Sequence, residues 1–66
     1  MRVGKILAVD EERGVVLYSF PEDPVHWGTS IDALTGDIAN YTKDTPIRVY
    51  YSRGMGSKVD HIELIN

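Results

Sequence analysis

The chain has 66 residues and no cysteine, so we expect one small domain over residues 1–66 and exclude disulfide bonds, cysteine-ligated zinc and thiol catalysis. With 7 Lys and Arg residues against 10 Asp and Glu residues, the formal charge is −3, which is unusual for a protein that binds duplex DNA. No signal-peptide pattern and no apolar run long enough to span a bilayer is visible, so we expect a cytoplasmic protein with no membrane partner.

The first part of the chain predicts a β-hairpin and a third strand. Residues 2–9 and 15–20 are rich in β-branched and aromatic side chains. The polar loop between them ends in Gly14, which suits a positive φ angle. The segment 21–24, Pro-Glu-Asp-Pro, predicts a break, because proline cannot donate to a strand ladder. A shorter strand is expected over residues 25–29.

The second part predicts two further strands after a long connection. Residues 30–45 have no clear period, although Ser30 can cap a single helical turn that Gly36 closes. Strands are expected over residues 47–52 and 58–65, joined by a glycine-rich turn. Five short strands with this spacing are typical of an all-β, five-stranded antiparallel OB-type barrel. An SH3-like barrel and an open five-stranded sheet are the alternatives.

Alternation of apolar residues indicates which side of each strand faces inward. The predicted core consists of Ile6, Val9, Val16, Tyr18, Val25, Ile31, Ile47, Val49, Ile62 and Leu64. Of the neighbouring Tyr50 and Tyr51, one must face outward, because adjacent strand residues point to opposite sides.

Short motifs over nearly the whole chain resemble those of the cold-shock domain family. Residues 4–6, Gly-Lys-Ile, are similar to the family's opening G-K-V, and residues 10–14 are similar to its N-x-E-K-G turn. Residues 25–27, Val-His-Trp, resemble the V-H-F segment of its second nucleic-acid motif. The resemblance implies a cold-shock-like OB barrel that binds single-stranded RNA or DNA.

The aromatic residues of that family's binding surface are largely replaced. Its first motif reads K-G-[FY]-G-F-[IV], whereas residues 13–18 here read Arg-Gly-Val-Val-Leu-Tyr, with aliphatic side chains at Val15 and Leu17. Pro24 and Ala8 replace two further rings. Because a stacked base contributes about 1–3 kcal/mol, we expect weak binding unless other rings compensate. The candidates for compensation are Tyr41, Tyr50 and Tyr51.

The residues predicted to bind nucleic acid or a partner are Lys5, Leu7, Arg13, Val15, Leu17, His26 and Trp27. Of these, the four apolar ones are expected to share one outer face, and a contiguous apolar patch often marks a protein contact. The alternative hypothesis is therefore a small protein-interaction or regulatory module that binds a protein partner or forms a homodimer. Trp27 could instead cover one end of the barrel as a largely buried residue.

Other polar clusters do not predict chemistry. His61 and Glu63 share one face of the last strand but Asp60 opposes them, so a metal site would lack a third ligand. Ser30, Asp32 and His26 have no nucleophile-elbow motif around them. We expect no enzymatic activity, no metal and no cofactor.

Overall fold

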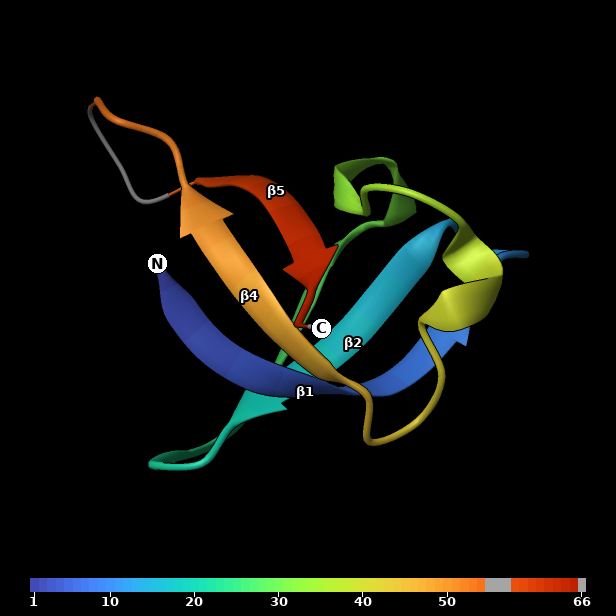
Figure 1. Cartoon of the computed structure of the whole chain (residues 1–66), viewed down its shortest axis with the longest axis horizontal. Coiled ribbons are helices and arrows are strands. Elements are labelled where there is room, and N and C mark those ends of the chain that lie inside the picture. Colours follow the sequence, from blue (N-terminus) through green and yellow to red (C-terminus); the bar gives the residue numbers. More distant parts are fainter. Residues whose placement is uncertain (55–57, 66) are drawn as a thin grey trace.

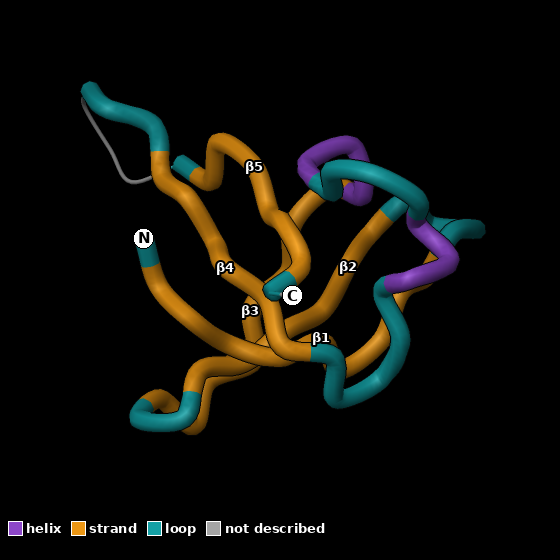
Figure 2. The backbone as a smooth tube through the Cα atoms, viewed as in Figure 1, coloured by secondary structure: helices purple, strands orange, loops and turns teal. Residues whose placement is uncertain are grey.

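A computed structural model describes residues 1–54 and 58–65 of the chain, and strands make up most of it (Figure 1). The strands are β1 (Arg2–Asp10), β2 (Val15–Phe20), β3 (Asp23–Ser30), β4 (Pro46–Tyr51) and β5 (Val59–Leu64). Two short 3-10 helices, η1 (Ile31–Ala33) and η2 (Ile38–Asn40), lie in the connection between β3 and β4 (purple in Figure 2). Within the described part of the chain, no helix is long and apolar enough to cross a membrane.

All five strands belong to one sheet with the order β3-β2-β1-β4-β5, and each is antiparallel to its neighbours. The predicted all-β, five-stranded antiparallel fold is therefore confirmed. The central strand β1 is long and strongly curved (Figure 1). Its beginning pairs with β4 and its remainder with β2, and a bulge lies between Ile6 and Ala8. Because a bulge bends and twists a strand, it helps the sheet to curl.

The connection that follows β3 is linked to the other outer strand, β5, by a short contact. Leu34, which follows η1, forms a parallel bridge with Ile62, and the Thr35 amide donates to the Ile62 carbonyl over 2.9 Å. The Tyr41 hydroxyl donates to the carbonyls of Thr35 (2.7 Å) and Ile62 (3.2 Å). We call these four residues the clasp. Residues 1–54 and 58–65 contain no ladder between β3 and β5, so the sheet curls without being closed by strand pairing.

The concave side of the sheet holds the hydrophobic core. Its buried residues are Ile6, Val16, Tyr18, Phe20, Leu34, Tyr41, Ile47, Val49 and Ile62. Val9, Ile31 and Leu64 pack against them while partly buried. The predicted core is thus confirmed except at Val25, while Phe20, Leu34 and Tyr41 were not predicted.

Strand β3 begins earlier than predicted, which explains the error at Val25. The break is confined to Pro21 and Glu22, and β3 starts at Asp23 and includes Pro24. Proline is tolerated there because an edge strand has one row of N–H groups outside the ladder. Val25 lies near this exposed beginning of β3, where its side chain is 51% exposed.

Two predicted turn features are confirmed. Gly14 has a φ of 71°, in the left-handed region that favours glycine. At the start of η1, the Ser30 hydroxyl accepts a hydrogen bond from the Asp32 amide over 3.2 Å. The predicted glycine-rich turn between β4 and β5 falls partly on residues 55–57, which lie outside the described residues.

Candidate nucleic-acid interface

The outer face of β2 and β3 carries an apolar patch that includes two of the predicted residues. Val15 and Leu17 alternate with buried residues of β2, so they point outward, and Leu17 is 39% exposed. Gly28 lies opposite Leu17 in the ladder, and a Cβ on Gly28 would lie 3.4 Å from Leu17 Cδ2. We call Val15, Leu17 and Gly28 the outer patch. It is smaller than the sequence predicted.

The remaining predicted residues surround this patch without enlarging its apolar area. Leu7 lies at the β1 bulge and is half-buried. His26 is exposed and lies two residues before Gly28, on the same side of β3. The Lys5 ammonium lies 3.5 Å from a carboxylate oxygen of Asp44, and Arg13 lies 3.7 Å from Asp10. Both predicted cations of this face therefore have a carboxylate beside them.

Trp27 does not belong to the outer patch, and the prediction that it shares a face with Val15 and Leu17 is wrong. Trp27 lies opposite Tyr18 in the β2–β3 ladder, and residues opposite each other project to the same side of a sheet. Tyr18 is buried in the core, so Trp27 lies on the concave side. Its side chain is still 43% exposed, and its indole N–H donates to Asp23 Oδ2 over 3.2 Å.

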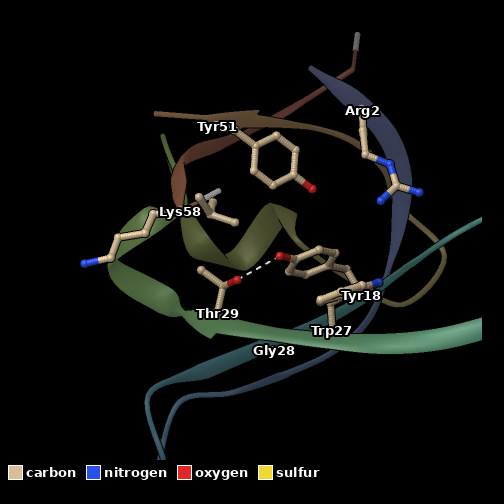
Figure 3. Close-up of a pocket in the computed structure, with 8 residues that line it drawn as sticks. Arg2, Tyr18, Trp27, Gly28, Thr29, Tyr51 and Lys58 are labelled. Carbon is tan, nitrogen blue, oxygen red and sulfur yellow. Dashed lines mark hydrogen bonds between the residues drawn. The ribbon is translucent and has the colours of Figure 1, made fainter. Parts of the chain in front are cut away.

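Trp27 instead helps to line an open pocket between the two outer strands of the sheet, which we call the seam pocket. Its volume is about 640 Å³, and the lining residues are Arg2, Tyr18, Trp27, Gly28, Thr29, Tyr51, Lys58 and Val59. Figure 3 shows the side chains of Tyr18, Thr29 and Tyr51 turned toward one another, whereas Lys58 points away. Three aromatic rings and two cations thus line the pocket, and no carboxylate is among its described lining residues.

Two hydroxyl groups form a polar spot on the wall of the seam pocket. The Tyr18 and Thr29 hydroxyl oxygens are 2.8 Å apart and share a hydrogen bond (Figure 3). Burial raises the pKa of Tyr18, and the hydrogen bond with Thr29 opposes that effect in part. Tyr18 therefore remains a neutral phenol at physiological pH and can exchange hydrogen bonds with a polar ligand.

The other tyrosines have separate environments. Tyr50 faces outward, where its ring stacks on His61 with centroids 4.5 Å apart and planes 10° apart, and its hydroxyl donates to Glu63 over 2.9 Å. Tyr51 is therefore the inward member of the pair. Tyr41 is only 3% exposed and belongs to the clasp, so it cannot stack on a ligand.

No protein-family model, curated protein or solved structure matches this chain. The chemistry of the two surfaces is therefore the basis for a function. The seam pocket combines aromatic faces, hydroxyl groups and a guanidinium, which suits a flat ligand with a negative charge. The outer patch offers only aliphatic contact area.

Proposed function

We propose that the chain binds single-stranded RNA or DNA and that one unpaired base enters the seam pocket. The observation that carries this proposal is that Trp27 and Tyr51 border one open pocket with Arg2 at its rim, while the buried Tyr18 contributes its hydroxyl group to the wall. Aromatic side chains stack on any base, and a neighbouring cation can contact the phosphate. Only a base outside a duplex can be turned into such a pocket.

The binding is expected to be weak and only moderately dependent on salt. A stacked base contributes about 1–3 kcal/mol, whereas micromolar affinity corresponds to about 8 kcal/mol, so we expect a single pocket to bind more weakly than micromolar. Each phosphate contact in a single strand adds about 0.7 to the slope of log K against log salt. Because few cations line the pocket and Glu22 and Asp23 lie close to it, we expect a shallow slope.

Tryptophan fluorescence tests the proposal directly, because Trp27 is the chain's single tryptophan. The emission is measured while oligo-dT or oligo-U is added at low and at moderate salt. We expect saturable quenching that weakens as salt rises. An emission that does not respond to either oligonucleotide at low salt would reject the proposal.

Adjacent tyrosines provide a matched pair of variants for the same titration. Tyr51→Leu removes a ring from the seam pocket, whereas Tyr50→Leu removes a ring from the outer face of the same strand. We expect Tyr51→Leu to weaken oligonucleotide binding and Tyr50→Leu to leave it near the wild-type value. Equal effects of the two changes would mean that the base does not enter the seam pocket.

The second candidate function is a protein-interaction module that uses the outer patch. The exposure of Leu17, a large apolar side chain that is 39% exposed beside Val15, favours it. Its partner would be another protein or a second copy of this chain. Sedimentation of the wild type and of Leu17→Ser over a range of concentrations tests self-association. Self-association that Leu17→Ser abolishes, with no response to oligonucleotides, would favour this function over the first.

A further inference from the structure

Arg2 is held at the rim of the seam pocket by two contacts. Its guanidinium carbon lies 3.7 Å from the centroid of the Phe20 ring, a cation–π contact that fixes the plane of the group. Its Nη2 donates to Glu22 Oε1 over 3.3 Å. The guanidinium has five N–H donors, and the contact with Glu22 engages one nitrogen. The side chain is therefore oriented by Phe20 and can still donate to a second group.

The ion pair between Arg2 and Glu22 is easily exchanged. The Arg2 side chain is 37% exposed and that of Glu22 is 72% exposed. Ion pairs in such positions are weak because water screens both charges. A phosphate group, by contrast, can accept two parallel hydrogen bonds from one guanidinium. A phosphate that reaches the rim of the pocket can therefore replace the single contact with Glu22.

We infer that Arg2 is the phosphate-binding residue of the seam pocket and that Glu22 occupies it when nucleic acid is absent. The inference rests on the proposed function, because the phosphate belongs to the nucleotide whose base enters the pocket. Lys58, the other cation of the lining, points away from the pocket (Figure 3). Glu22 is thus a built-in competitor that lowers the affinity for the single strand.

The sharpest experiment removes the charge of Glu22 and compares the affinity of this variant for oligo-U with that of a variant that loses one negative charge elsewhere. Glu22→Gln removes the charge that pairs with Arg2, whereas Glu12→Gln makes the same change in net charge in the β1–β2 turn, at the other end of β2. Oligo-U binding is followed by Trp27 emission at several salt concentrations. We expect Glu22→Gln to bind about two- to fivefold more tightly than Glu12→Gln, the range that corresponds to an exposed ion pair.

Changes at Arg2 provide the second readout. Arg2→Gln is expected to weaken binding and to reduce the slope of log K against log salt by about 0.7, the value for one phosphate contact in a single strand. Arg2→Lys retains the positive charge but loses the planar guanidinium that can donate two parallel hydrogen bonds. We therefore expect this variant to keep the salt slope of the wild type and to bind the oligonucleotide more weakly. Thermal unfolding of each variant shows whether the fold is retained. If Arg2→Gln does not fold, Arg2→Lys and Glu22→Gln decide the question.

Two failures have different meanings. If the wild type does not bind oligo-U, the proposed function is wrong, and the inference about Arg2 and Glu22 is wrong as well. If the wild type binds but Glu22→Gln and Glu12→Gln have equal affinities, Glu22 is not a competitor and the inference alone is wrong. An unchanged salt slope in Arg2→Gln would likewise show that the phosphate is bound elsewhere.

Discussion

Trp27 and Tyr18 are paired partners in the β2–β3 ladder, so the exposed indole and the buried phenol lie on the same, concave side of the sheet. Trp27 is therefore an extension of the core toward solvent and also a wall of the seam pocket. Its hydrogen bond to Asp23 Oδ2, 3.2 Å long, fixes the indole at this place. A change at Trp27 should consequently affect both binding and stability, to different extents.

We expect Trp27→Ala to abolish measurable oligonucleotide binding while lowering the free energy of unfolding only moderately. Truncation of a fully buried tryptophan costs about 3–5 kcal/mol, and the 43% exposure of Trp27 reduces the expected loss to about 1–2 kcal/mol. Thermal unfolding by circular dichroism measures stability, and the anisotropy of a labelled oligonucleotide measures binding. A loss as large as that of a core residue would instead support a purely structural lid role.

Two glycines, one on each of the strands that flank β2, should differ in how far the same substitution destabilises the protein. A Cβ on Gly4 would overlap the Ser19 carbonyl and lie 2.9 Å from Phe20 Cδ1, in the packed interior. We expect Gly4→Ala to destabilise the protein by about 1–3 kcal/mol, as overpacking does. A Cβ on Gly28 would make ordinary contacts at 3.4 and 3.6 Å with Leu17 and Val15.

The expected change for Gly28→Ala is therefore within about 0.5 kcal/mol. Urea unfolding of both variants, with the slope compared to that of the wild type, checks the pair. Similar stabilities of the two variants would contradict the close packing of β1 against Phe20.

The Tyr41 hydroxyl joins the connection after β3 to β5 through its bonds to the carbonyls of Thr35 and Ile62. Tyr41→Phe keeps the buried ring and removes both bonds. We expect a loss of about 0.5–1.5 kcal/mol, together with faster hydrogen exchange at the Thr35 amide, which donates to Ile62. Thr42 is a suitable control, because its hydroxyl bonds to Thr45 within the same loop. An effect of Thr42→Val equal to that of Tyr41→Phe would argue against the clasp.

The strands could be predicted because local patterns determine them. Val16 and Tyr18 alternate strictly with outward residues, and the same alternation includes Phe20, so the signal for a third core residue of β2 was present in the sequence. The alternation of side chains along β3 also shows that two of the predictions for this strand could not both be right. Val25 and Trp27 are two residues apart and therefore lie on one side of a regular strand, so an inward Val25 was incompatible with an outward Trp27.

The seam pocket could not be predicted from local patterns. It brings together Arg2 of β1, Thr29 of β3 and Tyr51 of β4, whose proximity depends on how far the sheet curls and on which end the clasp holds. Leu34 and Tyr41 lie in a connection without a period, so nothing in their neighbours indicates burial. The bridge between Leu34 and Ile62 and the hydrogen bond from Tyr41 to the Ile62 carbonyl, both long-range contacts, hold these two residues in the core.

The pair of Tyr50 and Glu63 on the outer face predicts a pH effect that is independent of nucleic-acid binding. The hydrogen bond from the Tyr50 hydroxyl to Glu63 raises the pKa of Tyr50 above its ordinary value of 10.0, with Arg48 acting in the opposite direction. The folded state therefore holds this proton more tightly than the unfolded chain. The resulting contribution to stability is fully present below pH 10.0 and is lost as the pH rises through the pKa of the folded state.

Glu63→Gln keeps an acceptor for the Tyr50 hydroxyl but removes the negative charge. We expect the pKa of Tyr50 to fall toward its ordinary value in this variant, and stability above pH 10.0 to decline less steeply than in the wild type. Carbon NMR of labelled tyrosine rings follows each phenol separately, with Tyr50→Phe identifying the signal. Because burial raises the pKa of Tyr18 by a different cause, its titration should be unaffected by Glu63→Gln. A Tyr50 titration that Glu63→Gln leaves unchanged would show that the 2.9 Å hydrogen bond does not hold the proton in solution.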